Sequence, residues 1–255
     1  MRALICLTAP PLTALLAMAY PHYSPVNSCL LHRQSLCRIW VPTRVLTKTI
    51  SHVFIRNGYY SSTARFGHTM NYEDMLSWSL FFTTLFDMKK SAMVDVVDPD
   101  GLVRSQALES SDGSLRITLN GAETHKTMAG SFLAESSNAS VQHIAFATDD
   151  IFASAQRLEA HGFAPLPIAR NYYADLAARF DIGTDMLERL RRQNILYDEN
   201  ARGKFFQLYS RPFADGMFFE IVQRAGGYDG YGGPNAPFRI AAQKRLMRPK
   251  GLPKI

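Results

Sequence analysis

The chain has 255 residues, of which 47% are hydrophobic and 20% charged, a composition typical of a globular protein with one or two domains. The formal net charge is +6, but no acidic residue precedes Glu73, and the chain from Glu73 onward carries 21 basic and 22 acidic residues. A nearly neutral body lacks the basic surface that binds nucleic acid, so we exclude nucleic acid as an expected partner.

Residues 1–66 are predicted to be an atypical or unstructured leader. Residues 3–19 follow Arg2 and resemble an export signal, although the pair Pro10-Pro11 interrupts them. The acid-free stretch also resembles an organelle transit peptide. We favour a third interpretation, in which these residues are not a folded unit and come from outside the true reading frame. The apolar run is too short for a membrane span, which needs about 20 consecutive apolar residues.

All three cysteines, Cys6, Cys29 and Cys37, also lie in this leader. The rest of the chain is therefore expected to have neither thiol chemistry nor a disulfide, as in a reducing compartment. We expect a cytoplasmic protein without a membrane anchor.

Residues 67–135 are predicted to form a first βαβββ module. A helix is expected over residues 73–86, which are acidic at the start and apolar at helical spacing. Three strands follow, separated by Pro-Asp-Gly and Ser-Asp-Gly turns: Ala92–Val97, Leu102–Glu109 and Leu115–Asn120. The strand that should precede the helix coincides with the end of the leader, so we expect it to be missing or replaced.

Residues 136–246 repeat this order as a second, larger module, followed by a tail over 247–255. The expected elements are a strand over Ser140–Thr148, a helix over Asp150–His161 capped by Asp149 or Asp150, one or two inserted helices over residues 172–192, and strands over Ile195–Tyr197, Phe205–Ser210 and Met217–Gln223. The repeat predicts an α+β fold in which two tandem modules form a half-open barrel around a shared cavity.

Two of these strands carry one metal-competent side chain each within an apolar run. Glu220 follows Phe218-Phe219, and a buried carboxylate needs a cation or a hydrogen-bond network. Alternation places Glu220 on the face of Phe218 and Val222, and His143 on the face of Val141 and Ala145. If those faces point inward, both side chains enter the barrel.

A histidine on a strand is also a common hydrogen-bonded core residue, so His143 alone does not establish a metal site. A histidine and a carboxylate are two parts of the 2-His-1-carboxylate set of non-haem Fe(II) enzymes. Ser105, Asn120 and Gln207 lie on neighbouring strands and are candidates for polar ligand contacts, with ordinary strand hydrogen bonding as the alternative.

From about Thr69 to Arg245 the chain resembles the C-terminal catalytic half of 4-hydroxyphenylpyruvate dioxygenase, in the vicinal oxygen chelate (glyoxalase-like) superfamily. The matching stretches are Val141–Ile151, Asn171–Tyr173, Asn194–Asp198, Phe206–Ser210, Phe218–Arg224 and Gly230–Gly232 with Asn235. Val94–Ser105 and Gly232–Gln243 are more similar to the dioxygenase-like C-terminal domain of bacterial two-domain 3-dehydroshikimate dehydratases.

The resemblance implies that His143 and Glu220 are the second and third ligands of Fe(II) or another divalent metal. It further implies that the metal is chelated by an aromatic 2-oxo acid beside dioxygen, and that Ser105, Asn120 and Gln207 contact this substrate. A helix over Ala236–Arg245 would close the pocket. No catalytic residue is expected beyond the metal site.

The first ligand is where the chain departs from the family. The resemblance places it thirteen positions before Trp78, where this chain has Arg65, and a guanidinium repels a cation. His68 lies three residues later and is the substitute candidate. An odd offset turns a strand side chain to the opposite face, although a bulge could bring His68 inward.

Three hypotheses follow from these residues. The first is a metal-dependent oxygenase of an aromatic 2-oxo acid with an incomplete metal site. The second is an accessory fragment of a bifunctional 3-dehydroshikimate dehydratase, which forms protocatechuate, without the N-terminal barrel that performs the dehydration. The third is a non-catalytic binding domain. A homo-oligomer is compatible with all three.

Overall fold

The computed structural model describes residues 64–111, 113, 115–136, 139–213 and 216–247. Most of the predicted leader and of the predicted tail therefore lies outside the described residues, which include only 64–66 and Met247 of those segments. Among the described helices, we find none with the length and apolar character needed to cross a membrane.

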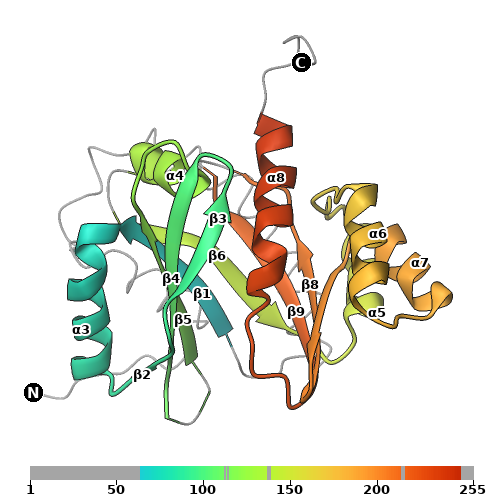
Figure 1. Ribbon diagram of the computed structural model, residues 1–255, viewed down its shortest axis with the longest axis horizontal. Helices are drawn as coiled ribbons and strands as arrows, with labels where there is room; N and C mark the ends of the chain where they lie inside the picture. Colours follow the sequence, from blue (N-terminus) through green and yellow to red (C-terminus); the bar gives the residue numbers. More distant parts are fainter. Residues whose placement is uncertain (1–63, 112, 114, 137–138, 214–215, 248–255) are drawn as a thin grey trace, which may run out of the picture. The chain divides into compact units, whose positions relative to one another are not determined.

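Nine strands form one mixed sheet in the order β2-β4-β5-β1-β6-β9-β8-β7, with β3 paired to β4. The strands are β1 (Ala64–Asn71), β2 (Lys89–Lys90), β3 (Val94–Asp98), β4 (Gly101–Glu109), β5 (Leu115–Ala122), β6 (Ser140–Ala147), β7 (Leu196–Asn200), β8 (Gly203–Tyr209) and β9 (Phe218–Gly226). The sheet curls into a half-barrel (Figure 1).

The pairing pattern shows that the sheet consists of two equivalent halves. In the first half β1 is parallel to β5, β5 is antiparallel to β4, and β4 is antiparallel to β3. In the second half β6 is parallel to β9, β9 is antiparallel to β8, and β8 is antiparallel to β7. The antiparallel pair β1–β6 joins them. The predicted α+β fold of two tandem βαβββ modules is confirmed.

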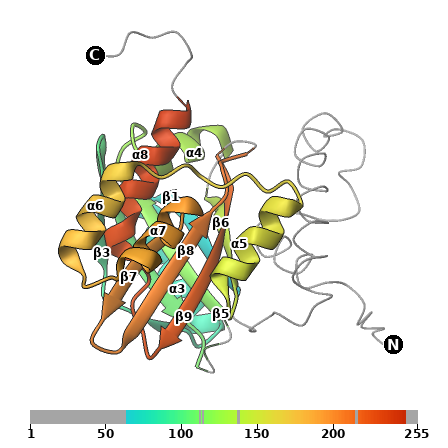
Figure 2. The same cartoon turned by 90° about the vertical axis from the view of Figure 1, so that its right-hand side faces the viewer.

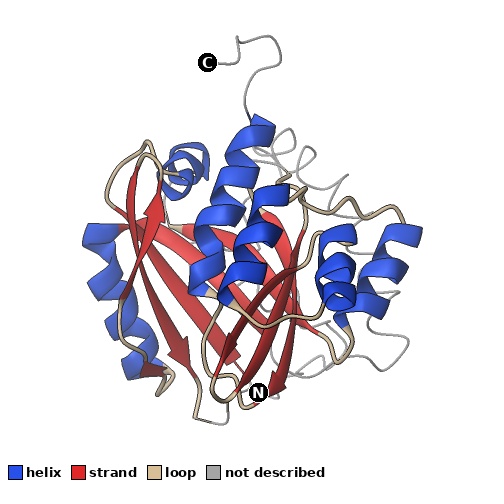
Figure 3. Ribbon diagram, turned by 45° about the vertical axis from the view of Figure 1, so that its right-hand side comes forward, coloured by secondary structure: helices blue, strands red, loops and turns tan. Residues whose placement is uncertain are grey.

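The helices pack around this sheet. They are α3 (Met75–Leu85), preceded by the 3-10 turn η1 (Tyr72–Asp74), then α4 (Met128–Ser136), α5 (Ile151–Ala160), α6 (Arg170–Arg179), α7 (Thr184–Arg192), the 3-10 turn η2 (Gly233–Asn235) and α8 (Ala236–Met247). Helix α3 packs on β4 and β5 (Figure 1), and α5 packs on β8 and β9 (Figure 2). Helix α8 lies between the two modules and contacts β3 (Figure 3).

Several boundaries follow directly from the sequence. The Asp150 carboxylate accepts a hydrogen bond from the Ala153 amide at 3.0 Å and caps α5, as one of the two predicted candidates. The insert over residues 172–192 forms two helices, α6 and α7. Helix α4 was not predicted, because its apolar stretch is short and shows no clear helical spacing of apolar residues. Thr127 caps it by accepting a hydrogen bond from the Gly130 amide at 3.0 Å.

The first module contains the strand that was expected to be missing or replaced. Strand β1 begins at Ala64, and Phe66, His68 and Met70 are all buried. The following helix α3 is less amphipathic than predicted. Its buried residues are Met75, Ser79 and Phe82, while Leu76 and Leu80 are 67% and 56% exposed.

One of two buried tyrosine hydroxyl groups on α6 connects this insert to β7 and η2. The Tyr172 hydroxyl accepts a hydrogen bond from the Tyr197 amide at 2.8 Å and lies 3.0 Å from Oδ1 of Asn235, to which it donates. The adjacent Tyr173 hydroxyl is also buried, but it has no hydrogen-bond partner among the described residues. Both tyrosines are therefore buried on the same helix, but only the hydroxyl of Tyr172 forms hydrogen bonds with other described residues.

We expect Tyr172→Phe to lower the free energy of unfolding by about 1–3 kcal/mol, because the Tyr197 amide and the Asn235 carbonyl lose a buried partner. Tyr173→Phe is the matched control and should not lower it, because its hydroxyl makes no bond to lose. Urea unfolding followed by circular dichroism measures both variants. Equal destabilisation by the two variants would contradict this assignment.

Candidate ligand and metal site

A cavity of about 90 Å³ lies between the modules, bordered by strands of both halves and by α4 and α8. It has room for roughly six water-sized groups, since one water needs about 15 Å³ on this measure. All the predicted site residues except His68 line it: His143, Glu220, Ser105, Asn120 and Gln207, together with Arg65. The structure therefore brings together residues that are up to 155 positions apart in the sequence.

The imidazole of His143 and the carboxylate of Glu220 converge within this cavity. Strand β6 pairs in parallel with β9, with His143 opposite Phe218 and Ala145 opposite Glu220. This register places the two polar residues diagonally on one face of the sheet. His143 Nε2 and Glu220 Oε2 are 3.8 Å apart, which is close enough for both to contact one ion or one ligand atom.

The imidazole of His143 is held between two rigid neighbours. It stacks on the Phe218 ring, with centroids 5.1 Å apart and planes 12° from parallel. On its other side is Gly67 of β1, where a Cβ atom would lie 2.0 Å from the imidazole Cε1 atom. Burial, only partly opposed by Glu220, lowers the pKa of His143 to about 4. The imidazole is therefore neutral at pH 7, the state that ligates metals.

A β-bulge beside His143 changes the predicted alternation of β6. Gly67 pairs with His143, whereas the next residue, His68, pairs with Val141, so Gln142 is an extra residue on β6. Gln142 lines the cavity, and its Oε1 atom accepts a hydrogen bond from Thr69 Oγ1 at 2.9 Å. The prediction that Val141 shares the face of His143 was wrong, because the bulge interrupts the two-residue period.

The Glu220 carboxylate is 3% exposed and is supported by hydrogen bonds. Its Oε1 atom accepts from Gln207 Nε2 at 2.8 Å and from the Tyr209 hydroxyl at 3.0 Å. Gln207 Oε1 in turn accepts from Asn235 Nδ2 at 2.8 Å. Burial and the neighbouring Glu220 raise the pKa of Tyr209 well above its usual range, so Tyr209 remains a hydrogen-bond donor. The network occupies one oxygen and leaves Oε2 facing His143.

The three side chains that were predicted to contact a ligand, those of Ser105, Asn120 and Gln207, thus form hydrogen bonds within the protein. Ser105 Oγ donates to Asn120 Oδ1 at 2.9 Å across the β4–β5 pair. Gln207 holds Glu220. Ordinary strand hydrogen bonding accounts for these bonds, while all three side chains also border the cavity.

Arg65 occupies the cavity face of β1. It pairs with Ala145 on β6, which pairs with Glu220 on β9, so the three residues form one row across the sheet. The small side chain of Ala145 leaves space for the arginine, whose guanidinium carbon lies 5.9 Å from the centre of the Phe205 ring. Burial lowers the pKa of Arg65, and the nearby Glu220 partly opposes this change.

His68 points away from the cavity. Its ring contacts Trp78 of α3 edge-on, with centroids 4.4 Å apart, and lies 6.4 Å from the Phe82 ring. Burial lowers its pKa to about 4, and its Nε2 atom has no hydrogen-bond partner among the described residues. The bulge between Gly67 and His68 does not turn this side chain inward. The structure therefore separates His68 from His143 and Glu220.

Arg239 and Tyr209 border the cavity and were not among the residues predicted for the site. Arg239 of α8 lines the cavity, and its guanidinium carbon lies 5.0 Å from the centre of the Phe218 ring. Tyr209 donates to Glu220. Tyr209 could have been found, because it lies two residues after Gln207 on a strand and so shares its face. Arg239 lies in the helix that was predicted to close the pocket, so its polar residues were candidates for contact with the cavity.

The described residues do not complete a 2-His-1-carboxylate site. They contain no group of three or more histidine, cysteine, aspartate or glutamate side chains placed to hold a metal ion. His143 and Glu220 are two donors, and Arg65, which borders the cavity with them, offers no lone pair to a metal. Three ligands with open positions are the usual arrangement for non-haem iron, so this donor set does not fit the metal.

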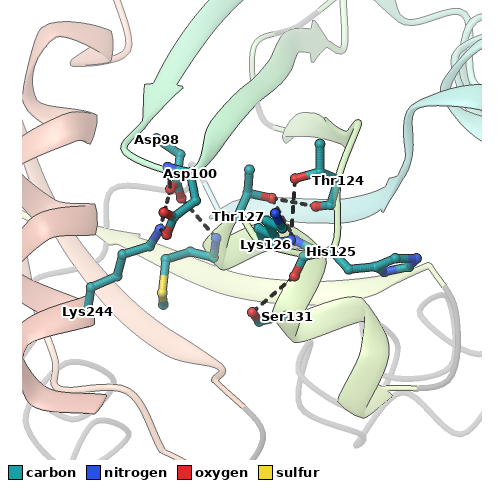
Figure 4. A network of polar contacts seen from close by, with 10 residues as sticks. Asp98, Asp100, Thr124, His125, Lys126, Thr127, Ser131 and Lys244 are labelled. Atoms are coloured by element: carbon teal, nitrogen blue, oxygen red, sulfur yellow. Dashed lines mark hydrogen bonds and ion pairs between the residues drawn. The ribbon is translucent and has the colours of Figure 1, made fainter. Parts of the chain in front are cut away.

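Helix α8 is fixed over the cavity by an ionic contact with the first module (Figure 4). The Lys244 ammonium group contacts the carboxylates of Asp98 and Asp100 at the β3–β4 turn. Asp98 Oδ2 also accepts a hydrogen bond from the Met128 amide of α4 at 2.9 Å. Because Asp98 is buried and borders the cavity, it joins both covering helices to the sheet beside the site.

Comparisons with known proteins agree with this fold. Residues 65–187 match the family model described as the Glyoxalase/Bleomycin resistance protein/Dioxygenase superfamily. A 3-dehydroshikimate dehydratase of Pseudomonas putida is 44% identical over 174 residues, which are 68% of this chain and 27% of that protein. A 4-hydroxyphenylpyruvate dioxygenase of Pseudomonas aeruginosa is 28% identical over 185 residues, which are 71% of this chain and 52% of that protein.

A solved structure that is similar to this chain also contains a dioxygenase-like part. A xylose isomerase-like TIM barrel/4-hydroxyphenylpyruvate dioxygenase fusion protein is 41% identical, with a TM-score of 0.61, over 72% of this chain and 29% of that one. The chain thus spans about a quarter of the length of the dehydratase and about half that of the dioxygenase.

We expect Gly67→Ala to displace the imidazole of His143, because the new methyl group would overlap it. Overpacking of this kind costs about 1–3 kcal/mol of stability, and the His143 ring should move away from Glu220. The control is Gly183→Ala, where the added Cβ meets no atom within 4 Å. Urea unfolding together with imidazole NMR shifts measures both effects. Unchanged His143 signals in Gly67→Ala would contradict the close contact.

Proposed function

We propose that the cavity is the ligand site of a 4-hydroxyphenylpyruvate dioxygenase-like domain, because residues 65–187 match the glyoxalase/bleomycin resistance protein/dioxygenase superfamily and the chain is similar to such a dioxygenase over 185 residues. Its ligand is an aromatic 2-oxo acid or a closely related compound. The observation that carries this proposal is the convergence of His143 and Glu220, 3.8 Å apart, in a cavity shared with Ser105, Asn120 and Gln207.

The lining of the cavity supports a ligand with an apolar body and a few polar groups. Apolar side chains border it on several sides: Val96, Val103, Met128, Phe218 and Ile240. The polar residues lie on strands of both modules, so one ligand of modest size can contact both. Such a mixture of apolar walls and few polar groups is the usual character of small-molecule sites.

The proposal includes an incomplete metal centre. In the role proposed here, His143 and Glu220 correspond to two of the three ligands of a divalent metal such as Fe(II), and Arg65 stands in place of the third ligand. A fixed guanidinium cannot donate to a metal and repels it. We therefore propose that the chain as it stands binds its ligand without the oxygen-dependent turnover of the dioxygenases.

We expect wild-type protein to hold clearly less than one iron per chain after anaerobic reconstitution with Fe(II) and desalting. Arg65→His should raise the content towards one, because it adds a neutral nitrogen donor and removes the repelling charge. The double variant Arg65→His, Glu220→Ala is the control and should lose that gain. Iron is measured by mass spectrometry. One tightly held iron in the wild type, or no gain in Arg65→His, would refute the incomplete-centre proposal.

A second candidate function is that of an accessory domain of a 3-dehydroshikimate dehydratase. It is favoured by the 44% identity to the Pseudomonas putida enzyme, of which this chain covers only 27%. The fusion of a TIM barrel with a dioxygenase-like part in a 41% identical structure also favours it. In this role the present domain supports a separate barrel in which the dehydration takes place.

This second role predicts that the chain alone does not convert 3-dehydroshikimate to protocatechuate, because the described residues lack the barrel. Adding the separately expressed barrel portion of the Pseudomonas putida enzyme should give activity, and adding this chain should raise it or stabilise the barrel. Protocatechuate absorbance is the readout, with serum albumin as the control addition. Protocatechuate formation by this chain alone, or no effect beyond that of albumin, would remove this candidate.

The proposed environment of the domain is the cytoplasm. All three cysteines lie before residue 38, so the described residues contain none, as expected in a reducing compartment.

A further inference from the structure

The guanidinium of Arg65 is a buried cation that has donors to spare. The residue is 7% exposed, and within the described part of the chain the contact seen for its guanidinium is with the Phe205 ring, at 5.9 Å, and not with a hydrogen-bond acceptor or an acidic group. A buried charge without a partner is costly, so a group in this position needs an anion or several acceptors. Because Arg65 borders the cavity, the partner can come from a ligand.

Glu220 lies near Arg65, but its carboxylate oxygens contact other side chains. Its Oε1 atom is already bonded to Gln207 and Tyr209, and its Oε2 atom faces His143 Nε2. The nearby Asp98 carboxylate is also committed, to Lys244 and to the Met128 amide. Of the residues that the structure describes, no other acidic one borders the cavity. The protein therefore leaves the positive charge of Arg65 available to a bound molecule.

A second cation borders the same space from α8. Arg239 uses one nitrogen to donate to Gln243 Oε1 at 2.6 Å, and its guanidinium carbon lies 5.8 Å from the centre of the Tyr209 ring. The charged side chains that border the cavity are thus two guanidinium ions, the Asp98 carboxylate committed to Lys244, and the half-engaged Glu220 carboxylate. The buried Tyr231 hydroxyl, which has no hydrogen-bond partner among the described residues, borders it as well. This balance attracts an anion, and a planar fork of N–H donors matches a carboxylate.

We infer that Arg65 binds the carboxylate of the ligand directly, so that the cavity takes up a small aromatic carboxylate without any metal ion. The aromatic ring lies against the apolar wall, and the charged end reaches β1. This inference rests on the proposed aromatic 2-oxo acid ligand and adds the group that recognises it. The guanidinium thus supplies at a fixed position the positive charge that a metal would otherwise supply.

The test is calorimetric titration of the full chain in excess chelator with two probes. 4-Hydroxyphenylpyruvate carries the carboxylate, and 4-hydroxyphenylacetone has the same ring and ketone without it. We expect the wild type to prefer the acid by at least about tenfold, as a lost charged hydrogen-bond pair implies. Arg65→Gln should abolish this preference, and Arg65→Lys should keep part of it, because an ammonium retains charge but not the fork.

Arg116→Gln is the matched control. Arg116 lies opposite Arg65 on the neighbouring strand β5, carries the same charge and pairs with Glu109 outside the cavity. The Arg116→Gln variant should keep the preference for the acid over the ketone. This result would separate the loss of a direct contact with the ligand carboxylate from a general loss of positive charge. Circular dichroism verifies that each variant is folded. A preference that survives Arg65→Gln, disappears equally in Arg116→Gln, or requires added Fe(II) would overturn the inference.

Pyruvate, which has no ring, distinguishes this inference from the proposed function. Binding of pyruvate that depends on Arg65, without binding of the aromatic acid, would support the carboxylate contact and reject the aromatic ligand. Equal binding of the aromatic acid to wild type and Arg65→Gln would support the ligand class and reject the contact. No binding of any probe to folded wild type would reject both.

Discussion

The structure depends on keeping one carboxylate, that of Glu220, buried at the junction of two half-sheets. A buried carboxylate is stable only with partners, and here Gln207 and Tyr209 supply two hydrogen bonds to one oxygen. Asn235 orients Gln207, and Tyr172 of the inserted helix α6 orients Asn235. The polar centre of the cavity is therefore supported by a chain of bonds that runs outward through the second module.

The repeated pairing of the two modules gives this centre its position. Each module places a parallel strand pair beside the central β1–β6 pair, and the register brings His143, Glu220 and Arg65 to one face. Gly67 provides the space that the His143 ring occupies. Arg65 adds a cation to this face. A guanidinium carries charge but offers no lone pair, and our proposal that the pocket takes up an anion in place of a metal rests on this property.

Much of this architecture could be predicted from the sequence, because strand alternation, turn residues and the repeat are local signals. The pairing of His143 with Glu220 followed from two polar residues in apolar strands. The bulge at Gln142 could not be predicted, because it depends on how β1 and β6 meet. The engagement of Gln207 with Glu220 and the approach of Arg239 from α8 likewise depend on tertiary packing, which no local period encodes.

The most direct test of this account is anomalous diffraction from wild-type crystals soaked with Mn(II) and 4-bromophenylpyruvate. The account predicts a bromine signal in the cavity, the ligand carboxylate within hydrogen-bond distance of the Arg65 guanidinium, and no manganese signal between His143 Nε2 and Glu220 Oε2. A manganese peak bonded to both side chains, with the oxo acid chelating it and Arg65 turned away, would contradict the account.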